Sequence, residues 1–401
     1  MIRLATILWW VMVGSASYAE PLRIYVDADF SNHAESARSI EMGINTALSE
    51  VGYQIAGHHV EVVRKDHRAN SLRSLRNMKQ FLADDRALLV IGGMHSPPYI
   101  QNREFINENE VLLLVAWAAG GPITRHPDKN NWVFRLSIDD TKAGYRLGQF
   151  ALEEKKCKTP HLLLEDTPWG KSNFATLSLY SQDQQGVDWP VTWFGWNTSF
   201  SQARTKVRDI MGKGSDCVIF VGNHLEGAQF ARAQLSLTDS KSTIISHWGI
   251  TGGTFQSDID AMAREQLDLN FIQTCFSFLA EEQTAKSKSA FAQAQILYPD
   301  ALKSLSDIPA PVGFIHAYDI GQIIIAALED VKIKGSMKRS RLKLREALES
   351  LEDPVEGLVK TYQSPFARWS PQNPDAHEAL GLQDICMARF DKQDNIVLHK
   401  D

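Results

Sequence analysis

The stretch ALLVIGGMHSPPYIQ, residues 87–101, decides how this chain folds. Its first five residues, 87–91, are all apolar, which is typical of a strand that is buried on both faces of a sheet. Two glycines end the run, and His95 and Ser96 follow before two prolines. A buried strand that ends in such a polar glycine turn is typical of the binding edge of an α/β sheet.

The same pattern recurs on both sides of this stretch. Strand-like runs at 21–29 and 58–66 flank a segment with helical spacing at 36–52, and another apolar run follows at 111–121. A second series of alternating strands and helices begins near residue 143. This order predicts an α/β fold with two Rossmann-like lobes, each built on a parallel sheet. The late elements must join one lobe or the other, so we expect several crossings between the lobes.

The first 19 residues are typical of a secretory signal peptide. Arg3 precedes an apolar run over residues 5–13, and small residues lead to Ala19. The run is shorter than the ~20 residues that span a bilayer. We therefore expect a signal peptide at 1–19, export to the periplasm and no membrane insertion of the mature chain.

The predicted lobes are discontinuous in sequence. Residues 20–140 plus 276–352 are expected to form lobe 1, and residues 141–275 plus 353–401 are expected to form lobe 2.

Composition and motifs exclude several classes of function. A net charge of −6 argues against a nucleic-acid partner, which would require a basic face. There is no GxSxG or HExxH motif. EDTPWGKS ends like a phosphate-binding loop, but Glu165 stands where the first glycine is needed. Asp27 and Asp29 fit an ordinary strand-end turn better than a catalytic pair. We expect no enzyme activity and no cofactor.

Polar clusters follow the ends of five predicted strands. Because ligands bind beyond the carboxyl ends of strands in open α/β sheets, a cleft between two lobes would collect both edges. The clusters lie at 92–96, 117–121, 166–170, 222–224 and 246–249.

At this point the sequence resembles the type I periplasmic solute-binding proteins of the leucine/isoleucine/valine-binding class, over about residues 21–400. The resemblance implies the type I periplasmic binding protein fold, in which several strands form a hinge between the lobes. Its partial motifs occur in order: EMGINTALSEV, IAGHHVEVVRKDHRAN, LLVIGGMHS, LLLVAWAAGGPIT, VFRLSIDDTKAG, LLLEDTPWGKS, DCVIFVGNHLEGAQFARAQ, HAYDIGQIIIAALE and DICMARFD.

The resemblance implies that lobe 1 grips a ligand carboxylate. The hydroxyl that would bind it follows the third strand and is that of Ser96. The backbone N–H groups follow the fourth strand and are those of Ala118, Ala119 and Gly120. His95 lies in the same loop as Ser96. Ser96 also fits the N-cap of the next helix, and the two roles are compatible.

Other positions depart from the amino-acid-binding pattern. Asp140 and Trp169 match residues of the family, but Gly120 stands where a Thr is common. Trp248 lies near the position where the family often has an acidic residue that binds the ligand ammonium. Together with Trp117, these tryptophans predict an aromatic box for cationic or aromatic ligands, with core packing as the alternative.

Three histidines, His95, His224 and His247, lie in three of these loops. They fit either a metal site or hydrogen bonds in a polar cleft, and we expect no metal. His224 is retained as a ligand-binding candidate. Glu226 fits either the missing negative charge or the start of a helix.

Three functions fit such a two-lobe protein. A monomer would deliver a small-molecule ligand to the permease of an ABC importer, or report the ligand to a membrane sensor kinase. An enzyme on a borrowed fold is the third reading. The sequence favours the importer, then the sensor.

Cysteine pairing is a separate expectation. In the strand order 2-1-3-4-5 usual for such lobes, Cys157 and Cys217 belong to neighbouring strands, so we predict that they form a disulfide. Cys275 and Cys386 either pair or stay as buried thiols.

Overall fold

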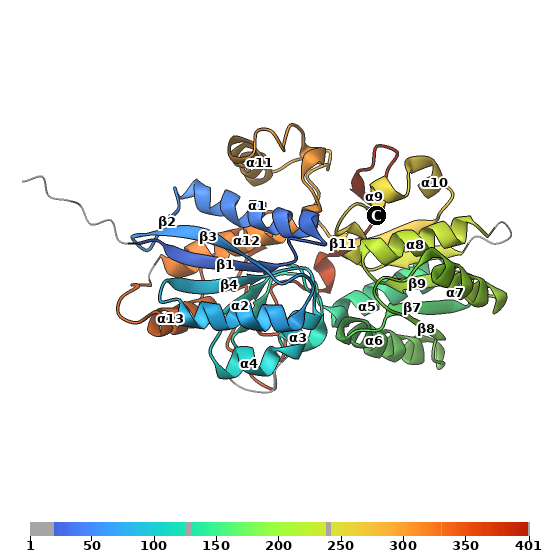
Figure 1. The fold of residues 1–401 in the computed structure, drawn as a ribbon, viewed down its shortest axis with the longest axis horizontal. Coiled ribbons are helices and arrows are strands. Elements are labelled where there is room, and N and C mark those ends of the chain that lie inside the picture. Colours follow the sequence, from blue (N-terminus) through green and yellow to red (C-terminus); the bar gives the residue numbers. More distant parts are fainter. Residues whose placement is uncertain (1–19, 126–129, 238–241, 330, 400–401) are drawn as a thin grey trace, which may run out of the picture.

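The computed structural model describes residues 20–125, 130–237, 242–329 and 331–399. Figure 1 shows two lobes side by side, each with a sheet between helices. The predicted fold class is confirmed. The predicted signal peptide, 1–19, lies outside the described residues.

Lobe 1 is built on a six-stranded sheet with the order β2-β3-β1-β4-β5-β6. β3, β1, β4, β5 and β6 pair in parallel, in the doubly wound order 2-1-3-4-5. The central strand β4 is buried along its length, as its apolar sequence predicts. The strands are β1 Leu22–Ala28, β2 Gln54–Ile55, β3 His58–Asp66, β4 Ala87–Gly92, β5 Leu113–Val115 and β6 Val133–Arg135.

Helices cover both faces of this sheet (Figure 1). α1 and α12 approach closely because Gly43 and Gly321 lack side chains. A Cβ on Gly43 would lie 2.2 Å from the carbonyl oxygen of Phe314, and one on Gly321 would lie 2.4 Å from Ala47 Cβ. The helices are α1 Ala34–Glu50, α2 Ser71–Ala83, α3 Pro97–Gln101, α4 Arg103–Glu108, η1 Gly121–Ile123, α11 Ala285–Leu297, η4 Leu305–Asp307, α12 Pro311–Leu328 and α13 Met337–Glu349.

Among the described residues, α12 is long and apolar enough to cross a membrane by length and composition. However, 78% of its residues are buried, and the helix packs against α1 and α13. Its apolar character is therefore explained by its place in the core.

Lobe 2 repeats the architecture with a seven-stranded sheet, in the order β15-β14-β11-β10-β9-β7-β8. The five strands that come first along the chain, β7 to β11, again have the spatial order 2-1-3-4-5. The antiparallel strands β14 and β15 extend the sheet beyond β11. The strands are β7 Pro160–Glu165, β8 Val191–Phe194, β9 Cys217–Val221, β10 Thr243–Ser246, β11 Leu269–Thr274, β14 Ile385–Phe390 and β15 Ile396–Leu398. The helices are α5 Asp140–Gln149, η2 Phe150–Glu154, α6 Pro168–Gln185, α7 Phe200–Gly212, α8 His224–Leu235, η3 Trp248–Thr251, α9 Phe255–Asp258, α10 Ala261–Glu265 and η5 Leu382–Asp384.

The segment between α13 and β14 begins the predicted 353–401 portion of lobe 2, and it also contacts lobe 1. Its short hairpin, β12 Val355–Glu356 and β13 Thr361–Tyr362, packs on α12. There Asp319 accepts hydrogen bonds from the N–H groups of Leu358 (2.6 Å) and Val359 (3.1 Å). Only β14 and β15 of the predicted 353–401 portion enter the second sheet. The lobe boundaries stay a prediction, and these contacts favour drawing 353–380 with lobe 1.

Both cysteine pairs form disulfides. Cys157 and Cys217 are joined with Cα atoms 5.9 Å apart, which confirms the predicted pairing. Cys275 and Cys386 are joined as well, with Cα atoms 4.9 Å apart between neighbouring strands β11 and β14. Each bond therefore ties adjacent strands of lobe 2.

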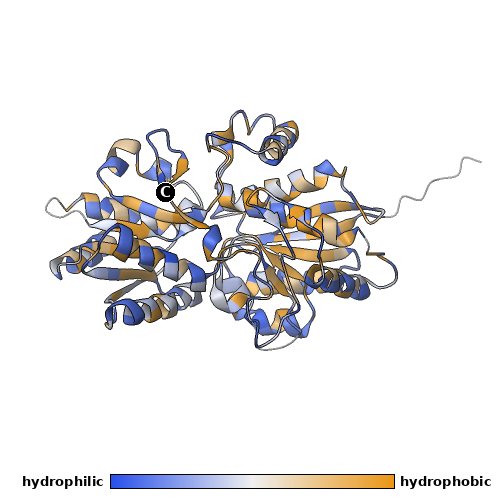
Figure 2. Cartoon of the chain, turned by 180° about the vertical axis from the view of Figure 1, so that it is seen from behind, coloured by the Kyte–Doolittle hydropathy of each residue, from blue (hydrophilic) through white to orange (hydrophobic). Residues whose placement is uncertain are grey.

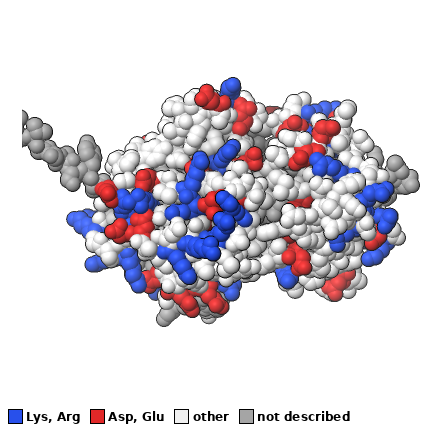
Figure 3. All heavy atoms as spheres, viewed as in Figure 1, with Lys and Arg blue, Asp and Glu red and all other residues white. Residues whose placement is uncertain are grey.

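Apolar residues gather on the strands inside each lobe, while the outer helices are more hydrophilic (Figure 2). One buried apolar cluster runs from lobe 1 into lobe 2, and Met94, Trp117, Trp169 and Trp248 all belong to it. On the surface seen in Figure 3, acidic and basic side chains are interspersed over both lobes. The lobes thus share an apolar cluster where they meet.

Candidate functional site

The predicted residues lie where the carboxyl ends of the two sheets face each other. His95 and Ser96 follow β4, and residues 116–120 follow β5 in lobe 1. Trp169 lies in the first turn of α6 after β7, and His224 begins α8 after β9 in lobe 2. All of these residues are buried. The edge-of-sheet rule therefore places these residues at the interlobe surface.

In lobe 1, Ser96 turns towards the loop after β5. Its Oγ accepts a hydrogen bond from the N–H of Gly120 (3.0 Å), and its side chain makes no helix-capping bond with α3. The N–H of Ala118 donates to the carbonyl of Gly93 (3.1 Å). Two of the predicted carboxylate donors are thus engaged within lobe 1, and the ligand role of this loop stays a prediction.

A buried ion pair contacts the backbone of the same loop. Arg135 Nε lies 2.8 Å from Glu378 Oε2, and Nη2 lies 2.6 Å from Glu378 Oε1. Arg135 Nη1 also donates to the carbonyls of Gly120 (2.9 Å) and Ala118 (3.3 Å). Arg135 therefore positions the loop that the resemblance assigns to ligand carboxylate. Sequence reasoning missed this pair because its members are far apart in the chain.

The three predicted tryptophans come together. Trp117 of lobe 1 and Trp248 of lobe 2 meet edge to face, with ring centroids 6.4 Å apart. Trp169 donates from Nε1 to Asp140 Oδ1 (3.1 Å) and packs edge to face on His247 at 5.0 Å. Each ring is buried, and Trp117 and Trp248 make contact from opposite lobes. Whether they contact a ligand stays a prediction.

Several buried polar atoms at this surface have no hydrogen-bond partner among the described residues. They include Trp117 Nε1, Asp140 Oδ2 and His247 Nδ1, and both ring nitrogens of His224. The other nitrogen of His247, Nε2, lies 3.3 Å from Asp140 Oδ1. A buried polar group without a partner costs about 1–3 kcal/mol. A concentration of such atoms is therefore a physical signal for a polar binding site.

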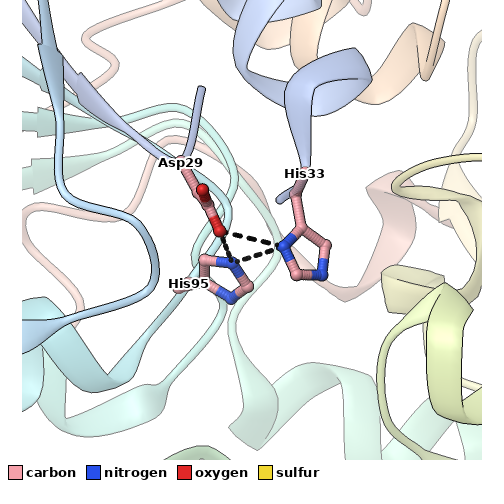
Figure 4. Close-up of side chains that lie close together, drawn as sticks. All are labelled: Asp29, His33 and His95. Carbon is pink, nitrogen blue, oxygen red and sulfur yellow. Dashed lines mark hydrogen bonds and ion pairs between the residues drawn. The ribbon is translucent and has the colours of Figure 1, made fainter. Parts of the chain in front are cut away.

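At one side of the surface, imidazoles from both lobes meet. Asp29 after β1, His33 before α1 and His95 after β4 form a compact group in lobe 1 (Figure 4). The ring of His224 in lobe 2 lies 5.1 Å from that of His33, and the ring of Trp196 lies 5.8 Å from that of His95. Sequence reasoning named His95 and His224 but missed His33, which the same edge-of-sheet rule predicts.

Burial governs the ionisation of this group. It lowers the pKa of His95 to about 3 and that of His224 to about 4, and the neighbouring His33 acts in the same direction on both. Burial opposes the ionisation of Asp29 as well, but hydrogen bonds from His33 and His95 hold the pKa of its carboxyl well below the usual range. The group therefore combines the neutral imidazoles of His95 and His224 with the Asp29 carboxylate.

A cavity of about 250 Å³ lies near the hinge, and none of the predicted site residues lines it. Lobe 1 contributes residues 305–311 and Ile315, and lobe 2 contributes Thr251, Gln256 and residues 394–396. Gln273 and residues 276–279, at the crossing between the lobes, also line it, as does Leu398. No motif marked these residues in the sequence.

Comparison with known proteins gives the family. The profile described as periplasmic binding protein matches residues 26–373. The chain belongs to this family. It is a family of binding proteins, which confirms the expectation that the chain is not an enzyme. A search of curated proteins finds no match.

Solved structures of this family share the fold at low identity. The leucine-binding protein LivK of Thermotoga maritima is 15% identical with a TM-score of 0.71, over 94% of this chain and 98% of LivK. LivJ of Streptococcus pneumoniae, solved with isoleucine, is 17% identical with a TM-score of 0.72, over 95% of this chain and 100% of LivJ. An R. palustris solute-binding protein, solved with 4-hydroxybenzoate, is 15% identical with a TM-score of 0.73, over 95% of this chain and 96% of that protein.

Proposed function

We propose that this chain is the solute-binding component of an ABC importer in the periplasm. It captures a small polar or amino-acid-like solute between its lobes and presents it to the permease. The family supports this reading, as do similar structures described as ABC transporter proteins. The ligands named for those structures include isoleucine, 4-hydroxybenzoate and benzoate, each of which carries a carboxylate.

One observation carries the proposal: partnerless buried polar atoms from both lobes meet at one surface. Trp117 Nε1 is a donor at the end of lobe 1's fourth parallel strand, and His247 Nδ1 belongs to lobe 2. Asp140 Oδ2 is an acceptor at the crossing between them. A core that serves only to hold the lobes together would pair these atoms or replace them with apolar ones.

The donors and the acceptor define the chemistry of the solute. A carboxylate fits the indole N–H of Trp117, while an ammonium or hydroxyl group fits the free oxygen of Asp140. The ring of Trp248 supplies an apolar or aromatic contact between them. Amino acids and hydroxylated aromatic acids combine these features, whereas a plain aliphatic acid lacks the donor for Asp140.

In this mechanism lobe 1 binds the solute first, and lobe 2 then closes over it. The loop at 118–120, held by Arg135 and Ser96, presents the lobe 1 half of the site when the lobes separate. Trp169 and Trp248 then cover the solute when the lobes close about the hinge. The solute shifts this equilibrium only by its differential affinity for the closed form.

A thermal-shift screen tests the proposal. The panel holds amino acids, aromatic acids with and without a hydroxyl group, and quaternary amines. A ligand at one hundred times its Kd adds ~2.7 kcal/mol to the free energy of unfolding, which raises the melting temperature visibly. We expect a hit that carries a carboxylate and a hydrogen-bond donor, and silence across the panel counts against the proposal.

The matched variants are Trp248→Leu and Trp193→Leu. Trp248 lies at the interlobe surface, while Trp193 packs on Phe174 within lobe 2. We expect Trp248→Leu to abolish the shift caused by the hit and Trp193→Leu to preserve it. The reverse result would place the site elsewhere.

A further inference from the structure

The geometry points to a divalent transition-metal site between the lobes, formed by Asp29, His33 and His95 with His224 as the fourth ligand. This site goes beyond the proposed solute site, because it uses none of Trp117, Asp140 and Trp248. Failure of one proposal therefore leaves the other standing.

The three lobe 1 residues converge because their strands are neighbours. β1 and β4 pair in parallel up to Asp27 and Gly92, so Asp29 and His95 extend from the same edge. The chain then turns after Asp29, and His33 becomes the residue before α1. Figure 4 shows the three side chains directed at one point.

The distances between their facing atoms match one metal ion. Asp29 Oδ2 lies 3.0 Å from His33 Nδ1 and 3.4 Å from His95 Nε2, and these two nitrogens are 3.2 Å apart. Ligands about 2.0–2.1 Å from a tetrahedral Zn²⁺ are separated from one another by about 3.3 Å. The three atoms thus already form one face of such a tetrahedron.

Hydrogen bonds account for at most two sides of this triangle at once. Each facing nitrogen has room for one proton, and Asp29 Oδ2 only accepts. If both nitrogens donate to Oδ2, both protons converge on this oxygen and the 3.2 Å contact between the nitrogens is not a hydrogen bond. If one nitrogen donates to the other, its contact with the carboxylate is lost. A cation at the centre uses all three lone pairs at once.

The surroundings hold the carboxylate in a ligating orientation. Asp29 Oδ1 accepts hydrogen bonds from the backbone N–H groups of Asn32 (2.9 Å) and Ser31 (3.2 Å), which directs Oδ2 towards the imidazoles. Such outer hydrogen bonds fix the geometry of metal ligands. The side chain of Asp29 is almost completely buried, so water does not compete freely for Oδ2.

His224, in lobe 2, lies beside these three residues. Its ring nitrogens fall outside the group whose ligand atoms all lie within 4.8 Å of one another, so its ring must move closer to bind the same ion. Its ring centroid lies 5.1 Å from that of His33. Two imidazoles on one tetrahedral ion have centroids about 5 Å apart. Both ring nitrogens of His224 are buried and have no hydrogen-bond partner among the described residues. A bound ion would therefore join the two lobes.

The donor set selects the class of metal. Three imidazoles and one carboxylate suit Zn²⁺ and similar borderline ions, whereas Ca²⁺ and Mg²⁺ prefer sites made of oxygen. Isothermal titration of metal-free protein with Zn²⁺, and the visible spectrum after addition of Co²⁺, measure binding directly. We expect one Zn²⁺ per chain and the strong absorption of tetrahedral Co²⁺.

Variants locate the ion. We expect Asp29→Asn and His95→Gln to weaken Zn²⁺ binding by at least about tenfold. His59→Gln is the matched control, because His59 is an exposed histidine on β3 and its loss should leave binding unchanged. Circular dichroism confirms that each variant is folded. Binding that is absent, or that survives both site substitutions, overturns the proposal.

His224→Gln tests the role of lobe 2. We expect weaker Zn²⁺ binding and an altered Co²⁺ spectrum, because the ion keeps three ligands and takes water as the fourth. Unchanged affinity together with an unchanged spectrum would remove His224 from the site.

Discussion

Glu165 illustrates how one buried residue sets a pH dependence. It ends β7, where Thr167 Oγ1 donates to its Oε1 (3.0 Å) and Asn223 Nδ2 donates to its Oε2 (3.2 Å). Burial raises the pKa of its carboxyl from 4.5 to about 7, and the nearby Glu226 acts in the same direction. Because the folded pKa lies above the unfolded one, the contribution of Glu165 to stability is complete below about pH 4.5 and lost as pH rises through about 7.

Glu165→Gln is therefore expected to stabilise the protein at alkaline pH. The amide has nearly the same size as the carboxyl group and carries no charge. The gain in the free energy of unfolding should therefore be about 1–3 kcal/mol at about pH 8 and should vanish near about pH 4. Urea unfolding across this range measures it. Asp166→Asn, at the exposed neighbour, is the control, and equal pH profiles for wild type and Glu165→Gln would contradict the argument.

Gly120 shows why this chain departs from the family pattern. A Cβ at this position would lie 2.7 Å from Ile100 Cδ1 and 3.0 Å from Ser96 Cβ. The threonine common in the family therefore has no room here unless the Ser96 loop moves.

Gly120→Ala is expected to destabilise the protein by about 1–3 kcal/mol through overpacking. Thermal unfolding measures the loss. Gly195→Ala is the control, since a Cβ there meets nothing within 4 Å. A neutral effect of Gly120→Ala would show that the loop yields easily, contrary to the close packing described.

At the scale of elements, the pair Arg135–Glu378 joins β6 to the segment before β14. Both side chains are almost fully buried, at 0% and 1% exposure. Arg135→Met leaves the Glu378 carboxylate without a counter-charge and should cost about 3–5 kcal/mol. The double variant Arg135→Met with Glu378→Leu should lose less than Arg135→Met alone. Denaturant unfolding of the set tests this, and additive losses would mean that the two charges do not interact.

The disulfide Cys157–Cys217 closes a long loop within lobe 2. The two residues are 60 positions apart, and removing a bond that closes such a loop costs about 2–5 kcal/mol. We expect the double variant Cys157→Ala, Cys217→Ala to unfold at lower denaturant while Cys275–Cys386 stays intact. An unchanged midpoint would show that the packing of β7 on β9 suffices without the bond.

At the scale of the molecule, the sequence predicted the two sheets and the edges that face each other. Continuous apolar strands alternating with helices leave few other arrangements, so His95, Trp117 and Trp248 were placed at one surface. The position of residues 353–380 was not predictable in this way. It depends on isolated long-range contacts, such as those of Asp319 with Leu358, which leave no periodic trace in sequence.

The site was predictable to a similar extent. The edge rule finds which loops converge, but it does not say which side chains are already satisfied. The N–H of Gly120 is bonded to Ser96, and His33 contacts His95; the edge rule marks the loops of these residues but not these contacts. Pairing between neighbouring atoms is decided by side-chain packing, which a single sequence does not encode in any short pattern.

The central claim is that one small solute contacts both lobes at once. Hydrogen exchange measured by mass spectrometry tests it most directly, with and without the low-molecular-weight fraction of a cell extract. The account predicts slower exchange in peptides that cover 94–100 and 117–121 of lobe 1 and 222–228 and 246–252 of lobe 2. Protection in one lobe alone, or in neither, would contradict the account.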